Sequence, residues 1–326
     1  MKKEEENRVD TSSSELRLFY KKIRRQRIAD ANTHIPPCLD PKTGVESKDI
    51  NISYETGVYV RLYKPKKVDK KSKMPLLLYF HGGGFCMDST YSSKYHNHLN
   101  QLAAEAQAMI VSVEYRRTPE HRLPAAYNDG WDALNWVFNS NTRDYQSWIQ
   151  EHVDFGRVYL MGDSAGANIA HQLALRGKRQ NQNVVSINGI ILVHPYFWGS
   201  QRIGHEACNV KNKISHLDIA DKFWALARPS NSMEADHPWI NPGNDPCLSS
   251  LGCNHVLVLI AQNDLLRGRG LYYKEVLEKS GWQGTVEVVE SIGEDHTFHL
   301  AKPFADNTFQ LIEKVVAFLY PLRSTL

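Results

Sequence analysis

The chain has 326 residues, of which 42% are hydrophobic and 23% are charged, and its formal net charge is +3. This length and composition suffice for one large folded domain and exclude an intrinsically disordered chain. The small net charge does not indicate a nucleic-acid partner, and no apolar run reaches the length of a membrane span. We therefore expect a single domain over residues 1–326 with no membrane span and no nucleic acid as partner. The sequence does not indicate whether the protein is a monomer or an oligomer.

The first 45 residues precede the first expected strand. Their charged opening has no apolar core of the kind found in signal peptides. Leu16, Phe19, Tyr20 and Ile23 then recur at helical spacing, which predicts a helix with one apolar face. We expect residues 1–45 to fold over the functional site as a cap segment.

Strand-like apolar runs alternate with helix-like segments along the rest of the chain. The expected strands are Asn51–Tyr54, Val58–Tyr63, Leu76–Phe80, Met109–Val113, Val158–Met161, Ile190–Val193, Val256–Ile260 and Thr285–Glu290. Helices are expected around Ala103, over Trp131–Phe138, Ala165–Arg176 and Gly270–Lys279, and from Phe304 onward. The alternation predicts an α/β fold, with a mostly parallel eight-stranded sheet, an antiparallel start and helices on both faces.

A glycine-rich loop, His81–Phe85, directly follows the third expected strand. Three successive glycines are a costly choice for a simple connection, because glycine loses the most backbone freedom on folding. We interpret the loop as an oxyanion hole, in which the backbone N–H groups of Gly83 and Gly84 bind the oxygen of a reacting acyl group.

The pentapeptide Gly162–Gly166 stands where an expected strand gives way to a helix, and Ser164 is its central residue. Such a turn exposes the central side chain, while the flanking glycines let strand and helix approach closely. The G-x-S-x-G pattern also occurs in ordinary turns, but together with the glycine-rich loop it predicts that Ser164 is a nucleophile. The N–H of Ala165, at the helix N-terminus, would be a third oxyanion donor.

Residues 197–245 lie between two expected strands and do not fit the sheet. This insertion carries several large apolar side chains, namely Trp198, Ile219, Phe223, Trp224 and Trp239. Ordinary helix packing accounts for most of them, and some are expected to line an apolar pocket. We expect the insertion to form the second part of the cap; which side chains face the pocket is left open.

Asp264 follows Val256–Ile260, an apolar run that reads as a buried parallel strand. It therefore lies at the carboxyl end of a strand, where α/β sheets carry their functional groups. Aspartate is also a favoured N-cap, so Asp264 could instead cap the helix Gly270–Lys279. The chain order of serine, acid and histidine favours the catalytic role, in which Asp264 orients a histidine base.

Two histidines near the C-terminus, His296 and His299, compete for the role of that base. A histidine suits the role because its pKa near neutrality lets it take the serine proton and return it to the leaving group. His299 would fall at the start of a helix, as a structural or solvated side chain. His81, His121 and His194 are expected to make structural hydrogen bonds.

The fourteen histidines and five cysteines include no pair with a metal-site spacing such as C-x-x-C or H-E-x-x-H. We therefore expect neither a metal nor another cofactor. An odd number of irregularly spaced cysteines argues against a disulfide framework and fits a reducing compartment. We expect the cytoplasm as the location, with the nucleus as a second one.

Several strings resemble the plant carboxylesterases of the α/β-hydrolase fold, in the branch similar to hormone-sensitive lipase. They are Arg61–Pro65, His81–Phe85, Ser112–Arg116, Pro119–Tyr127 and Gly162–Gly166, and the resemblance extends over nearly the whole chain. It implies a serine nucleophile, an acid after a later strand and a histidine near the C-terminus. His296, but not His299, matches the family's G-x-x-H-x-F pattern, so the resemblance assigns the base to His296.

The resemblance implies a serine carboxylesterase that hydrolyses small esters, such as those of alkaloids and other plant specialised metabolites. Two alternatives stay open. Some relatives are lyases that catalyse dehydration, elimination or cyclisation, although the isoflavonoid dehydratases carry threonine where this chain has Ser164. The related gibberellin receptors bind a hormone without turnover and lack the histidine that matches His296. Ser164 and His296 therefore favour hydrolysis.

Overall fold

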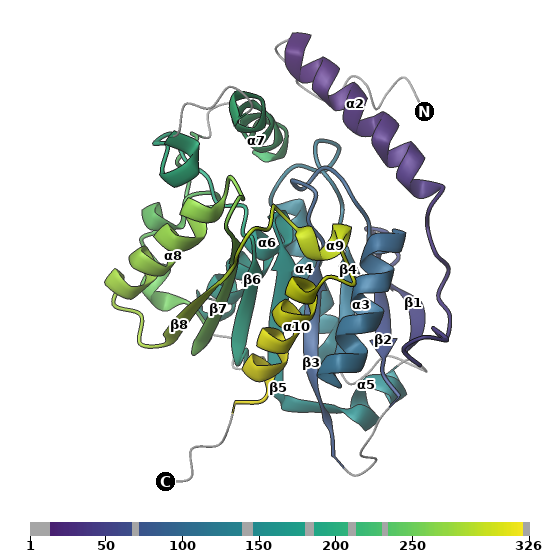
Figure 1. The fold of residues 1–326 in the computed structure, drawn as a ribbon. Helices are drawn as coiled ribbons and strands as arrows, with labels where there is room; N and C mark the ends of the chain where they lie inside the picture. The colour runs from purple at the N-terminus through teal and green to yellow at the C-terminus, as the bar shows by residue number, and fades with distance from the viewer. Residues whose placement is uncertain are drawn as a thin grey trace.

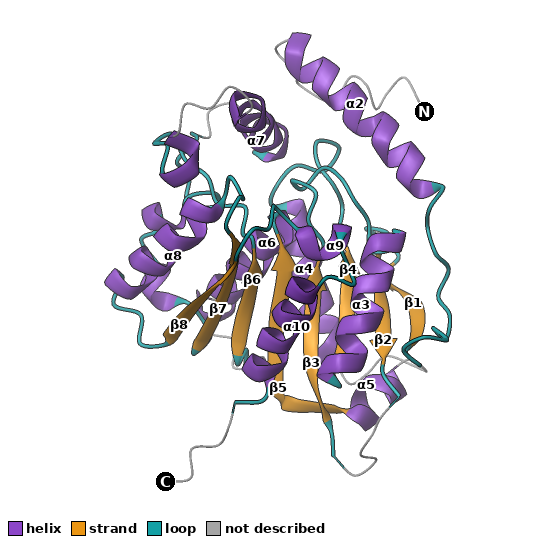
Figure 2. Ribbon diagram, in the orientation of Figure 1, coloured by secondary structure: helices purple, strands orange, loops and turns teal. Residues whose placement is uncertain are grey.

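The computed structural model of the chain describes residues 14–66, 72–138, 146–179, 186–207, 213–229 and 234–321. Within these residues a sheet of eight strands, in the order β1-β2-β4-β3-β5-β6-β7-β8, forms the centre of the molecule. Helices cover both of its faces (Figures 1 and 2). The expected α/β architecture, with an eight-stranded sheet and helices on both faces, is thereby confirmed.

The eight strands all overlap the expected ones. They are β1 (Glu46–Ser53), β2 (Val58–Lys64), β3 (Met74–Phe80), β4 (Met109–Glu114), β5 (Val153–Asp163), β6 (Gly189–Val193), β7 (His255–Ala261) and β8 (Thr285–Ser291). β2 pairs antiparallel with both β1 and β4, and the pairs from β4 through β3 to β8 are parallel. The expected antiparallel start is therefore present.

The described helices are α2 (Ser14–Ala31), α3 (Ser93–Ala106), α4 (Ala125–Phe138), α5 (Gln146–His152), α6 (Ala165–Arg179), α7 (Lys213–Ala227), α8 (Arg267–Lys279), α9 (Phe298–Ala301) and α10 (Asp306–Leu319). Sequence patterns did not predict α5 and α9, because seven and four residues are too few to show helical periodicity. None of the helices in the described ranges is both long and apolar enough to cross a bilayer.

The two faces of the sheet pack against different helices. Strands such as β3 are buried along their whole length, as expected for parallel strands covered on both sides. One core contains side chains of α4, α6 and α8, and the other contains side chains of α3 and α10. This packing fixes the strands and therefore the loops at their carboxyl ends.

Two helices, α2 and α7, lie beyond the carboxyl ends of the strands (Figure 1) and contact each other. Phe19 of α2 meets Phe223 of α7 edge to face, with ring centroids 5.2 Å apart. Arg27 donates hydrogen bonds to the carbonyl oxygens of Cys86 and Thr118. Both expected cap regions thus contribute a helix above the sheet, while residues 1–13, 208–212 and 230–233 of them lie outside the described part.

Candidate active site

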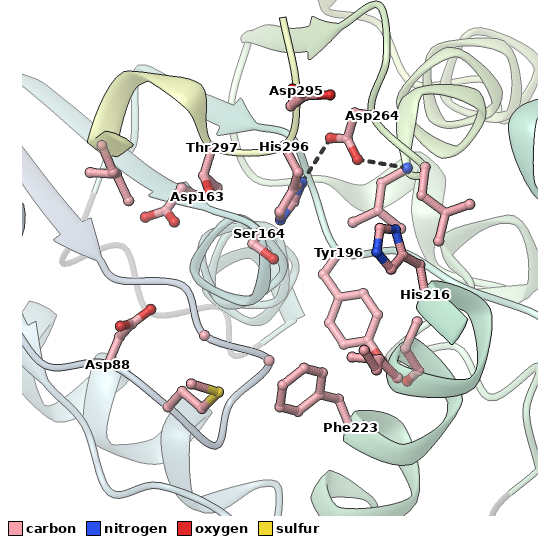
Figure 3. A pocket seen from close by; sticks show the side chains of 18 of the residues that line it. Asp88, Asp163, Ser164, Tyr196, His216, Phe223, Asp264, Asp295, His296 and Thr297 are labelled. Carbon is pink, nitrogen blue, oxygen red and sulfur yellow. Dashed lines mark hydrogen bonds and ion pairs between the residues drawn. The ribbon is translucent and has the colours of Figure 1, made fainter. Parts of the chain in front are cut away.

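A cavity of about 620 Å³ lies at the carboxyl ends of the strands. Gly83 after β3, Ser164 after β5, Asp264 after β7 and His296 after β8 all line it. Parallel strands bring their carboxyl ends to one edge of the sheet, so positions far apart in the sequence meet there. The predicted nucleophile, acid and histidine are brought together in this cavity (Figure 3).

Ser164 occupies the turn between β5 and α6 with φ of 52°, in the left-handed region that side chains other than glycine rarely adopt. Its N–H donates to the carbonyl oxygen of Val193 (2.8 Å), and its carbonyl accepts from the N–H of Tyr196 (2.9 Å). A Cβ atom at Gly166 would lie 1.9 Å from the carbonyl oxygen of Phe80. Only glycine therefore allows α6 to begin this close to β3.

His296 and Asp264 form a direct hydrogen bond, with 2.8 Å between Nδ1 and Oδ2. The other oxygen of the buried Asp264 carboxylate accepts the N–H of Leu266 over 2.9 Å. α8 begins at Arg267 with Leu266 in the N-cap position, so Asp264 is not the helix cap. Its two oxygens instead join the turn before α8 to the imidazole of His296.

The pKa values of this pair shift in opposite directions. Burial alone would lower the pKa of His296, but the charge and hydrogen bond of Asp264 outweigh burial and raise it above 6.5. Burial alone would raise the pKa of Asp264. The charge and hydrogen bond of His296 and the N–H of Leu266 outweigh burial and hold that pKa below its usual value. Each group therefore stabilises the charged form of the other.

His194 lies behind this pair and is buried. Its Nδ1 accepts the backbone N–H of Thr297 over 2.8 Å, and burial lowers its pKa to about 4. In the described ranges, His194, Asp264 and His296 each bring one possible metal-ligand atom within 4.8 Å of the others. The hydrogen bonds of His296 with Asp264 and of Thr297 with His194 account for this arrangement. The contact with Thr297 agrees with the structural role predicted for His194.

Burial also lowers the pKa values of His299 and His81. His299 is fully buried in α9 against His98, with ring centroids 4.8 Å apart, and its pKa is well below 6.5. The solvated alternative for His299 is therefore wrong, and its role is structural. His81, the first residue of the glycine-rich loop, is buried, and desolvation lowers its pKa to about 3. His121, by contrast, is exposed.

The glycine-rich loop reaches the cavity through Gly83 and Gly84, whose φ values are 89° and 60°. A Cβ atom at Gly84 would lie 2.5 Å from Cγ of Phe223, so α7 packs directly on this glycine. The N–H of the preceding residue, Gly82, donates to the hydroxyl of Tyr95 over 2.8 Å. Ala165, the third expected oxyanion donor, is buried as the first residue of α6.

The structure distinguishes among the apolar side chains of the insertion. Ile219 and Phe223 line the cavity, whereas Trp198 and Trp224 are buried in the core and Trp239 packs against it. His216 and Ala220 line the cavity beside Ile219 and Phe223. Ile219, Ala220 and Phe223 follow His216 at three, four and seven residues, so the four positions share one face of α7.

Several cavity residues were missed by the sequence patterns, among them Asp88, Lys94, Tyr95 and Tyr196. The first three lie within a dozen positions of Gly84, and the continuation of an oxyanion loop could have been searched for them. Asp163 belonged to the recognised motif but had no role assigned. Burial raises its pKa to about 6, although hydrogen bonds from Tyr79 and Tyr95 oppose that shift.

Comparison with known proteins agrees with this architecture. The α/β hydrolase fold family matches residues 77–300, and the carboxylesterase family matches residues 22–119. Probable carboxylesterase 7 of Arabidopsis thaliana is 43% identical, covering 92% of this chain and 95% of its own length. A 2-hydroxyisoflavanone dehydratase of Glycyrrhiza echinata is 38% identical, with coverage of 95% and 96%.

An esterase of Pyrobaculum calidifontis has a similar solved structure, with a TM-score of 0.70 over 93% of this chain and 92% of that one. At 24% identity this structural similarity supports the fold alone. The matched family covers most of the chain, and the plant relatives match it nearly from end to end. The chain therefore belongs to the α/β-hydrolase family and, within it, to the plant carboxylesterases, a group of carboxylic ester hydrolases.

Proposed function

We propose that this protein hydrolyses esters through an acyl-enzyme on Ser164, with His296 as the base and Asp264 as its orienting acid. The observation that carries the proposal is the 2.8 Å hydrogen bond between His296 and Asp264 in a cavity that Ser164 also lines. The same three residue types perform acyl transfer on several unrelated folds.

In the first half of the reaction, His296 takes the proton of the Ser164 hydroxyl while Oγ attacks the ester carbonyl carbon. The hydrogen bond to Asp264 keeps a proton on Nδ1, which leaves Nε2 as the atom that can accept the serine proton. The resulting imidazolium lies beside the Asp264 carboxylate, which stabilises it. His296 then returns the proton to the departing alcohol, and the acyl group stays on Ser164.

The negative charge on the carbonyl oxygen requires donors that are already in place. The N–H groups of Gly83, Gly84 and Ala165 would bind this oxygen in the tetrahedral intermediate. Gly83 and Gly84 border the cavity, and Ala165 directly follows Ser164. Removing one such donor costs about 3–4 kcal/mol of activation free energy in well-studied hydrolases.

In the second half, water attacks the acyl-enzyme and His296 acts as base again. The His296 side chain is 37% exposed, so water can reach it from the open side of the cavity. Proton transfer to His296 and then to Ser164 releases the acid and restores the free enzyme. No step of this sequence calls for a metal or organic cofactor.

The substrates we propose are small esters, with plant specialised metabolites, including alkaloid esters, as the expected group. A cavity of about 620 Å³ suits a molecule of that size. The cap regions proposed at residues 1–45 and 197–245 would bound it, since α7 supplies one wall.

The location we propose is a reducing compartment, the cytoplasm or the nucleus. Four described cysteines support it as free thiols, namely Cys38, Cys86, Cys247 and Cys253.

The test compares the wild type with Ser164→Ala for hydrolysis of p-nitrophenyl butyrate and for labelling by a fluorophosphonate. We expect Ser164→Ala to lose at least about 10³-fold in kcat and all of the label. The exposed Ser200, outside the cavity, provides a matched Ser200→Ala control that should keep both. An unlabelled wild type without turnover would contradict the proposal and favour a receptor.

Elimination is the second candidate, and the likeness to the 2-hydroxyisoflavanone dehydratase is the observation in its favour. In such a reaction His296 would take a proton from carbon, and the same donors would stabilise an enolate oxygen. Incubation with a 2-hydroxyisoflavanone, followed by mass spectrometry, distinguishes the two. Loss of one water from the substrate at a rate comparable to ester turnover would put elimination first.

A further inference from the structure

The cavity has two walls of different chemical character. Ile219, Ala220 and Phe223 of α7, together with Leu265 and Leu266, make one side mostly apolar, with His216 of the same helix face as its polar residue. Asp88 and Lys94 stand on the other side, and Figure 3 shows Asp88 and Phe223 as separate parts of the wall around Ser164. A substrate held at Ser164 therefore meets an apolar surface and a polar one.

Asp88 and Lys94 form an ion pair within this polar wall. Lys94 Nζ lies 2.6 Å from Asp88 Oδ1, and the side chains are 42% and 12% exposed, respectively. The second carboxylate oxygen, Oδ2, lies 3.0 Å from the place that a Cβ atom at Gly83 would occupy. The carboxylate is thus next to the loop that we propose as the oxyanion hole.

The backbone of Asp88 is held in an unfavourable conformation. Its φ is 65°, in the left-handed region, which costs free energy for a residue other than glycine. Its carbonyl oxygen accepts a hydrogen bond of 2.6 Å from Arg117, which fixes that conformation. A strained residue kept in place on the wall of a cavity points to a binding role for its side chain.

The chemistry of the pair selects what it can bind. Asp88 offers only acceptors and Lys94 only donors, and together they carry no net charge. A carboxylate ligand would be repelled by Asp88, and an ammonium ligand by Lys94. A hydroxyl group suits both, because it donates to Asp88 and accepts from Lys94 with the same oxygen.

We propose that Asp88 and Lys94 form a subsite for a hydroxyl group of the substrate. The substrate class is then an amphipathic ester, such as a partial ester of a polyol or an ester of a hydroxy acid. Its apolar part lies against α7. This inference rests on the proposed acyl-enzyme mechanism at Ser164 and names the substrate of that same site.

The test uses two pairs of esters that differ only in hydroxyl groups. The first pair is glycerol 1-monobutyrate and propyl butyrate, which varies the alcohol; the second is ethyl 3-hydroxybutyrate and ethyl butyrate, which varies the acid. We expect kcat/KM to favour the hydroxylated member by about tenfold or more in at least one pair. The ratio is measured within one protein sample, so partial misfolding of a variant does not change it.

Asp88→Asn and Lys94→Met should each bring that ratio close to unity. Lys274→Met is the matched control, because it breaks an ion pair with Glu278 on the surface of α8, outside the cavity. Its ratio should equal that of the wild type. Ethyl hydrogen succinate, the anionic analogue, should be hydrolysed less well than ethyl 3-hydroxybutyrate.

Three results would overturn the subsite while leaving the proposed function in place. They are equal rates within both pairs for the wild type, an unchanged ratio in both variants, and a preference for the anionic ester. If the wild type hydrolyses none of these esters faster than Ser164→Ala does, the acyl-enzyme proposal itself fails and the subsite with it.

Discussion

The hydroxyl group of Tyr95 donates a hydrogen bond of 2.9 Å to Oδ2 of Asp163, the residue immediately before Ser164. The same hydroxyl accepts the backbone N–H of Gly82 over 2.8 Å. One side chain of α3 therefore joins the glycine-rich loop to the strand end that carries Ser164. Tyr79 donates to the other oxygen of Asp163, Oδ1, over 2.8 Å.

We expect Tyr95→Phe to lower kcat for p-nitrophenyl butyrate by about tenfold to a hundredfold, with a smaller change in KM. The variant leaves the N–H of Gly82 without its acceptor, so Gly83 and Gly84 lose their fixed position relative to Ser164. Steady-state kinetics on the purified variant measures this. Tyr79→Phe is the matched control, since it removes an equivalent hydrogen bond to Asp163 and should cost about threefold or less.

An equal loss in the Tyr95 and Tyr79 variants would show that only the environment of Asp163 matters. The positioning of the loop by Tyr95 would then be refuted.

The pH dependence of hydrolysis should follow the ionisation of His296. His296 must be neutral to accept the Ser164 proton, and its pKa lies above 6.5 because Asp264 outweighs the effect of burial. The kcat/KM for an uncharged ester should therefore rise with pH and level off above a midpoint higher than 6.5. A pH–rate profile between about pH 5 and pH 9 measures the midpoint.

Asp264→Asn should move that midpoint to lower pH and reduce the plateau by about 10³- to 10⁴-fold, because the imidazolium loses its counter-charge. Asp295→Asn, at the exposed neighbour of His296, is the control and should leave the midpoint in place. A wild-type midpoint below 6.5 would contradict the raised pKa of His296.

Gly84→Ala should reduce kcat by about a hundredfold or more, because the added methyl group would meet Phe223 at 2.5 Å and displace the loop. The double variant with Phe223→Ala should recover part of the activity, since the obstructing ring is gone. Gly57→Ala controls for backbone strain: Gly57 also has a positive φ, 71°, but no atom lies within 4 Å of the added Cβ. No recovery in the double variant would rule out the contact with Phe223 as the cause.

A buried ion pair should dominate the stability of the region around α8. Arg269 and Glu206 lie 2.6 Å apart, and their side chains are 3% and 0% exposed. Arg269→Met leaves the Glu206 carboxylate buried without its partner and should lower the free energy of unfolding by about 3–5 kcal/mol. Urea unfolding followed by tryptophan fluorescence measures this change.

Arg267→Met is the control for that comparison, two positions away. Arg267 pairs with Glu290 at 2.6 Å, but the two side chains are 31% and 25% exposed. The exposed pair should contribute about 1 kcal/mol or less. Comparable losses in both variants would mean that burial does not set the strength of these pairs.

The sequence predicted the meeting of Ser164, Asp264 and His296 because each follows an apolar strand. In a parallel sheet, strand ends gather at one edge. The choice of His296 over His299 came from the family resemblance. The polar wall was not predictable in this way. Asp88 reaches the cavity through a left-handed backbone conformation that no residue pattern specifies.

The environment of His299 shows a second limit. Its position at the start of a short helix allowed either a solvated or a structural side chain. What buries it is α3, which carries His98 and lies far from it in the sequence. A local sequence pattern predicts helices and strands. The burial of a given side chain depends on which helices and strands, distant in the sequence, pack around it.

Arg27 of α2 binds the carbonyl oxygens of Cys86 and Thr118, and Phe19 of the same helix touches Phe223. An attachment near α2 therefore affects the cavity differently from an attachment after α10. A bead, dye or fused domain tethered near α2 would exert force directly on the glycine-rich loop and on α7, which border the cavity. One tethered after α10 would pull on the opposite end of the sheet, so immobilisation for flow catalysis belongs there (Figure 1).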